Sequence, residues 1–92
     1  MSEIQTDTSI EELLKESLGD SHEIVLFNDD VNTFDHVIEC LVKYCSHSPM
    51  QAEQCSYIVH YNGKCSVKKG ALQKLRPINQ ALIDQKLRAK II

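Results

Sequence analysis

The chain carries, at residues 24–30, the stretch IVLFNDD, in which a run of apolar side chains ends in an amide and two carboxylates. An uninterrupted apolar run of this kind predicts a strand at residues 24–27 that is covered on both faces. Asn and Asp side chains commonly bond nearby backbone amides, so they favour a loop at residues 28–31. None of these polar groups is a strong nucleophile. They offer hydrogen-bond acceptors and negative charge, which predict a site for a cation such as an ammonium group.

Two helices are expected after this strand. Asn32 is predicted to cap the first, in which apolar residues recur at three- and four-residue steps as far as Cys45. Ser48 is predicted to cap the second, with Pro49 at its first position, and this helix should run to about residue 61. The side chains expected to face inward are Phe34, Val37, Ile38, Leu41, Val42, Cys45, Ala52, Cys55, Ile58 and Val59.

The C-terminal third predicts strand, helix and strand. A short strand is expected at residues 64–67, followed by a break at residues 68–70 and a helix over residues 71–85. Pro77 should either kink that helix or mark its true start, because proline lacks a backbone donor. Apolar and basic residues alternate over residues 87–91, as in a half-buried strand. The predicted class is α+β, in the order β-α-α-β-α-β, with three helices packed on a small three-stranded sheet, antiparallel or mixed.

A length of 92 residues fits one small domain. Residues 22–92 are the predicted core domain, and residues 1–21 a flexible extension rich in Ser, Thr and acidic residues. The extension has too little apolar material to fold alone. A transient helix within it is suggested by the spacing of Ile10, Leu13, Leu14 and Leu18.

Composition excludes several function classes. A net charge of −3 argues against general binding to nucleic acid or to anionic membranes. The polar, acidic start is unlike a signal peptide, and no apolar run reaches the length of a membrane span, so the cytoplasm is the expected location. An enzyme is not expected, because the sequence shows neither a nucleophile beside a recognisable base nor a phosphate-binding loop.

The cysteines stand at irregular spacings, without a C-x-x-C pair, at positions 40, 45, 55 and 65. They are predicted to be reduced, free and buried as small hydrophobes, and neither a metal nor another cofactor is expected. A small metal or thiol protein using His60 and these cysteines is the alternative from another class. The remaining histidines are expected on the surface, namely His22, His36 and His47.

A second polar group lies near the end of the second predicted helix, where His60 stands in the stretch IVHYNG at residues 58–63. Taken singly, the NDD stretch also fits a turn, and His60 also fits a surface or capping role. Read together, the motifs are more specific. The combination NDD at 28–30, VIECL at 37–41, AEQ at 52–54 and VHYNGK at 59–64 resembles the ClpS family, bacterial adaptors of the Clp proteases.

The resemblance covers residues 24–65 firmly and the rest of the chain weakly. It implies the fold that ClpS shares with the C-terminal domain of the ribosomal stalk protein. It also implies a non-enzymatic, monomeric adaptor that binds N-degrons, proteins whose first residue is bulky and hydrophobic. The adaptor would hand them to a ClpA- or ClpC-type AAA+ unfoldase. By resemblance, Asn28, Asp29 and His60 would hold the substrate's α-amino group. The side-chain pocket would be lined by Asn32, Phe34, Val37, Ser56, Val59 and Leu87.

The sequence departs from the family pattern at the side-chain pocket. Phe34 stands where the family usually has methionine, Ser56 where it has a bulky gating residue, and Asn32 where it has threonine. The segment at residues 64–66 is also shorter than usual. These changes leave the amine-binding residues in place and alter the pocket. A ClpS-like domain that docks on the unfoldase without binding N-degrons therefore remains an alternative.

Overall fold

The computed structural model describes residues 21–92, so the helix suggested within the N-terminal extension lies outside the described residues. The elements are β1 (Ser21–Phe27), α2 (Phe34–Cys45), α3 (Pro49–Asn62), β2 (Lys64–Ala71), α4 (Leu72–Asp84) and β3 (Arg88–Ile91). This order confirms the predicted β-α-α-β-α-β arrangement. None of the helices in residues 21–92 is long and apolar enough to cross a membrane.

The sheet has the strand order β2-β1-β3, and both pairings of the central strand are antiparallel. The predicted break at residues 68–70 is wrong, because β2 continues through it to pair with β1. Gly70 lies opposite His22. The register shifts at a bulge, because Ile24 pairs with Lys68 and Val25 with Ser66, which leaves Val67 as the extra residue of β2. Pairing supplied by a distant strand thus overrides the local turn signal of Lys-Lys-Gly.

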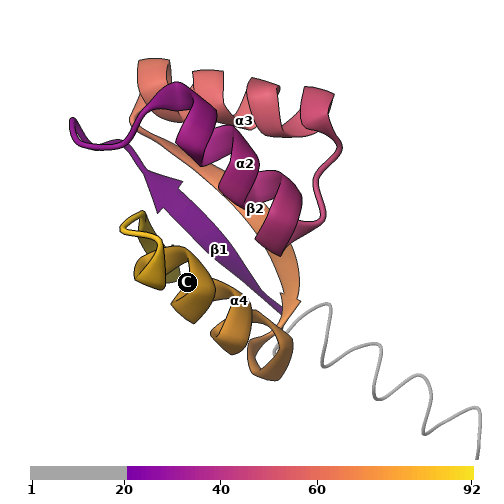
Figure 1. Cartoon of the computed structure of the whole chain (residues 1–92). Coiled ribbons are helices and arrows are strands. Elements are labelled where there is room, and N and C mark those ends of the chain that lie inside the picture. The colour runs from indigo at the N-terminus through magenta and orange to yellow at the C-terminus, as the bar shows by residue number, and fades with distance from the viewer. Residues whose placement is uncertain (1–20) are drawn as a thin grey trace, which may run out of the picture.

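The three helices form a continuous layer in which α2 lies between α3 and α4. Helix α4 contacts all three strands, whereas α3 packs beside β2, and Figure 1 shows β1 running up to the loop that leads into α2. Alternate residues of β1, Ile24 and Leu26, point into the core between the sheet and the helices. The largest fully buried side chains are Ile24, Leu26, Leu41, Leu75, Leu82 and Cys45.

Two helix starts differ in how well the sequence predicted them. Ser48 caps α3 as predicted, since its hydroxyl accepts a bond from the Gln51 amide at 3.1 Å. The predicted cap of α2 is wrong by one residue: Thr33 is the N-cap, and its Oγ1 accepts from the His36 amide at 3.1 Å. The Asn32 side chain instead donates its Nδ2 to Asp29 in the loop and to the Lys86 carbonyl after α4.

Pro77 lies inside α4, which begins at Leu72, so the proline does not mark the helix start. Its missing donor leaves only the Gln73 carbonyl without a helical partner, and both residues lie on the exposed face, where water can bond that carbonyl. Two residues expected to face inward are exposed instead: Ile58 is 42% and Val42 37% exposed. Both lie at the edge of their helix's apolar stripe, where neighbouring helices do not cover them.

His47 and His36 are not the surface residues that the sequence suggested. His47 is only 6% exposed, and its Nε2 lies 2.6 Å from the Val67 carbonyl oxygen. His36 is half-buried, with Nε2 3.0 Å from the Gln85 carbonyl oxygen. Both bonds join residues that are far apart in the chain, so no local sequence motif predicts them.

The core cysteines behave as small hydrophobes. Cys40 and Cys45 are buried, as predicted, while Cys55 and Cys65 are half-buried. Burial raises the pKa of the Cys45 thiol to about 11, so this group stays a neutral thiol at physiological pH. Among residues 21–92, no three His, Cys, Asp or Glu side chains stand close enough together to hold a metal ion.

Candidate functional site

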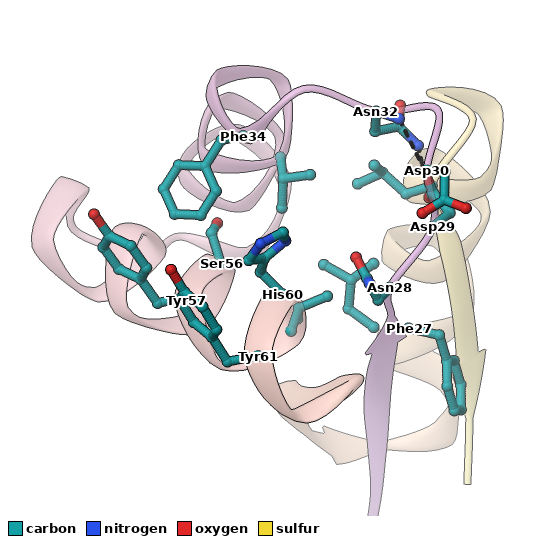
Figure 2. Close-up of a pocket in the computed structure, with 14 residues that line it drawn as sticks. Phe27, Asn28, Asp29, Asp30, Asn32, Phe34, Ser56, Tyr57, His60 and Tyr61 are labelled. Atoms are coloured by element: carbon teal, nitrogen blue, oxygen red, sulfur yellow. Dashed lines mark hydrogen bonds between the residues drawn. The ribbon is translucent and has the colours of Figure 1, made fainter.

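A cavity of about 530 Å³ opens where the end of β1 meets the start of α2 and the last turns of α3. It is the size of pockets that enclose small organic ligands. Every residue that the sequence placed in the candidate site lines it (Figure 2): Asn28, Asp29, Asn32, Phe34, Val37, Ser56, Val59, His60 and Leu87. The structure therefore brings together groups from four segments, namely the end of β1, the start of α2, the last turns of α3 and the turn before β3, which lie up to 59 positions apart in the chain (87 − 28).

Backbone pairing sets the distance between Asn28 and His60. The amide of Asn28 donates to the Gly63 carbonyl at 2.9 Å, directly beyond the paired residues Phe27 and Lys64. Gly63 ends α3 with φ of 92°, a left-handed conformation that glycine adopts without the steric cost of a Cβ. Because His60 lies in the last turn before Gly63, the end of β1 is fixed beside its helix.

Asn28 is held by its backbone. Its N–H bonds to Gly63, and its carbonyl accepts a bond from Nη1 of Arg88 at 3.4 Å. Neither bond uses the side-chain amide, whose oxygen accepts no hydrogen bond from residues 21–92 and can accept one from a ligand. His60 is exposed at the cavity wall, and its ring meets the Tyr61 ring edge-on with centroids 4.8 Å apart. A neutral imidazole there offers one acceptor nitrogen.

Asp29 acts as a fixed negative charge in the loop. Its Oδ1 accepts bonds from the amides of Val31 at 2.9 Å and Asn32 at 2.8 Å, and its Oδ2 accepts from Asn32 Nδ2 at 2.8 Å. Partial burial by itself would raise the pKa of Asp29, but these bonds and the charge of Arg88 outweigh it and lower the pKa below its usual value. The carboxylate is thus ionised at neutral pH and favours a cation nearby.

Asn32 ties the loop to the C-terminal part of the fold. Its Nδ2 donates both to Asp29 and to the Lys86 carbonyl, each at 2.8 Å. Lys86 has a φ of 72°, and this tight turn presents the next residue, Leu87, to the cavity. Leu87 is only 4% exposed, so it forms a fixed apolar wall. The Asn32 side chain, which was predicted to cap a helix, therefore links the loop of the site to the turn at Lys86.

The remaining walls come from facing sides of α2 and α3. Val37 is half-buried and Val59 only 5% exposed, so they present an apolar surface. Ser56 is 3% exposed and donates its hydroxyl to the Ala52 carbonyl at 2.8 Å. That bond satisfies the hydroxyl within the helix, and the small side chain leaves room in the cavity. Phe34 stands across from it at the start of α2 (Figure 2).

Sequence reasoning missed part of the lining. Tyr57 and Tyr61 border the cavity, although neither was assigned to it, as do Leu26, Phe27 and Asp30. The two tyrosines are four residues apart on α3, so they share a helical face with the turn that carries His60. That spacing was the signal available in the sequence. Asp30 belongs to the NDD stretch, and it is exposed.

The fold and the site together define a small α+β binding domain. Its cavity sets acceptors and a carboxylate beside apolar walls, which suits an ammonium group attached to an apolar side chain. The family model described as ATP-dependent Clp protease adaptor protein ClpS matches residues 18–90. The chain belongs to the ClpS family, and adaptor function toward the Clp protease is the role of that family.

Two individual relatives of known sequence are also ClpS adapter proteins. The chain is 31% identical over 64 residues to the ClpS adapter of Thermosynechococcus vestitus, a match covering 68% of each protein. It is 36% identical over 63 residues to the ClpS adapter of a Nostoc species, covering 67% of this chain and 65% of the relative. Among solved structures, Agrobacterium tumefaciens ClpS2 bound to L-phenylalaninamide has a TM-score of 0.74 at 16% identity, covering 79% of this chain and 95% of that one. This last likeness concerns the fold.

Proposed function

We propose that the protein binds substrates with a free N-terminal amino group and a bulky hydrophobic first residue, and delivers them to a ClpA- or ClpC-type AAA+ unfoldase. The observation that carries the proposal is the meeting of Asn28 and His60 in one cavity with apolar walls. The protein would act without catalysis or a cofactor, as a monomer when free, in the cytoplasm. Agrobacterium ClpS2, a structural neighbour, was solved with L-phenylalaninamide, an amine beside a phenyl ring.

The amine half of the site matches an N-terminal ammonium. An α-amino group has a pKa of about 7.7–8.0, so it is mainly charged at neutral pH and offers three donors. The side-chain oxygen of Asn28 and a neutral nitrogen of His60 would accept two of them, and a water molecule the third. Asp29 already accepts three bonds within the loop, so its proposed contribution is negative charge rather than a direct contact.

The apolar half of the site matches a large first side chain. Burying a Leu or Phe side chain contributes roughly 1.5–3 kcal/mol. Together with the charge-assisted hydrogen bonds, and after subtracting the cost of ordering the peptide, this reaches about micromolar affinity. A direct test is a binding screen of peptides that differ only at residue one. Leu, Phe, Tyr and Trp should bind, while Ser, Asp and Lys should not. Equal binding of all seven would contradict the proposal.

The departures from the family pattern should set the order of preference among large residues. Changing Ser56→Met would fill space that the serine leaves open, and Phe34→Met would replace a rigid ring with a flexible chain. Each change is expected to alter the ranking of Leu, Phe, Tyr and Trp peptides by severalfold without abolishing binding, as measured by competition with one labelled peptide. Unchanged ranking in both variants would show that these residues do not shape the occupied part of the cavity.

The N-terminal extension is proposed to act in delivery. Removing residues 1–20 leaves in place every cavity-lining residue that the structure describes, and we expect peptide affinity to stay within about twofold. Degradation of an N-degron reporter by unfoldase and peptidase should fall strongly. Both quantities can be measured on the same purified variant. Loss of peptide affinity would instead make the extension part of the fold or of the binding site.

A further inference from the structure

The cavity continues past the predicted site onto a row of aromatic rings. Phe34 and Tyr57 have ring centroids 4.7 Å apart with planes tilted by 57°, and Tyr57 and Tyr61 follow at 6.1 Å with planes only 11° apart. The row, here called the aromatic shelf, runs from the inner wall of the cavity to its rim. All three residues line the same cavity.

The outer rings of the shelf are open to a ligand. Tyr57 is 48% and Tyr61 75% exposed, although both rings are large and mostly apolar. Exposed tyrosines that border a pocket are typical of binding surfaces, because they bring rigid contact area at little cost in conformational entropy. Tyr61 is also steadied from one side by the edge of the His60 ring.

The shelf lies where a bound peptide chain can leave the cavity. Figure 2 shows Tyr57 and Tyr61 on one side of His60, and Asn28, Asp29 and Asp30 on the other. In the proposed pose, the amine lies between Asn28 and His60, and the first side chain lies between α2 and α3. The second residue of the peptide must then leave the cavity either over the tyrosines or over the Asn-Asp-Asp loop. A volume of about 530 Å³ is in the range that encloses a whole small ligand, so it exceeds what one amino-acid side chain fills.

We propose that the aromatic shelf of Phe34, Tyr57 and Tyr61 is a second subsite, which selects substrates with an aromatic or long apolar side chain at residue two. The inference rests on the proposed function and adds to it a preference at the following position. A ring placed on this shelf can stack on Tyr61 or meet it edge-on. Relative to alanine, such a contact should strengthen binding by about three- to tenfold.

The test compares otherwise identical peptides beginning Leu-Ala, Leu-Trp and Leu-Lys, competed against one labelled Leu-initiated peptide. The wild-type protein should bind Leu-Trp about three- to tenfold more tightly than Leu-Ala. Tyr61→Ala should reduce that preference, measured as the ratio of the two affinities in the same variant, to less than twofold, and Tyr61→Phe should retain it. Met50→Ala is the matched control, since Met50 is 71% exposed at the opposite end of the same helix and lies outside the cavity.

Each outcome decides the inference. Binding of Leu-Ala with no preference for Leu-Trp, or a preference that survives Tyr61→Ala, overturns the second subsite and leaves the proposed function standing. Tightest binding of Leu-Lys, insensitive to Tyr61→Ala, would place the chain over Asp29 and Asp30 instead and overturn it as well. Failure of all three peptides to bind the wild-type protein would remove the proposed function together with the subsite.

Discussion

Asn28→Ala and His60→Ala are each expected to weaken binding of a Leu- or Phe-initiated peptide by about tenfold or more. Each substitution removes one acceptor and leaves a donor of the buried ammonium group without a partner, which costs roughly 1–3 kcal/mol. A factor of ten corresponds to about 1.4 kcal/mol. Both side chains are proposed to touch the same group, so the double variant should lose less than the sum of the two single losses.

The fold should survive these substitutions, which makes the result interpretable. The hydrogen bonds that fix Asn28, to Gly63 and from Arg88, use its backbone, and His60 is exposed. Asn62→Ala is a suitable control, because Asn62 is an exposed amide at the same end of α3 that does not line the cavity. Peptide affinity by fluorescence anisotropy and the midpoint of thermal unfolding should be measured on every variant. Losses that are fully additive, or that follow a falling midpoint, would argue that the two residues act separately or only through stability.

The order of elements was predictable because local signals and packing agree. The apolar run at residues 24–27 is the centre of the sheet, and the Ser48 cap and the alternation at residues 87–91 each appear in the structure. Local reasoning failed where distant contacts decide. β2 passes through Lys-Lys-Gly because β1 pairs with it, and His47 is buried because the Val67 carbonyl provides its partner. Nothing near either segment in the sequence indicates those contacts.

The same distinction applies to the candidate site. The resemblance to the ClpS family was enough to predict which residues meet, since all nine of them line one cavity. It was not enough to predict what Asn32 does there, because its partner, the Lys86 carbonyl, lies 54 positions away. The tyrosines were missed for a different reason. Their spacing in the sequence indicates that they share a helical face, but only the tertiary fold shows that this face borders the cavity and not solvent alone.

The protein is proposed to recognise a free, charged N-terminus. Acetylating a peptide's amino group removes its positive charge and two of its donors, and it adds bulk at the point where the ammonium should sit. The acceptors of Asn28 and His60 would then be left unpaired or blocked, and the charge of Asp29 would face a neutral group. Since each unpaired buried acceptor costs roughly 1–3 kcal/mol, the combined loss should exceed tenfold.

The most direct measurement is therefore the affinity of one Leu-initiated peptide in its free and N-acetylated forms, determined by competition under identical buffer conditions. A peptide with the same composition but an internal Leu and an N-terminal Ser serves as the control for nonspecific apolar binding. We expect the free peptide to bind more than tenfold more tightly than both others. Equal binding of the free and acetylated peptides would contradict it and would favour a family member that docks on the unfoldase without reading N-termini.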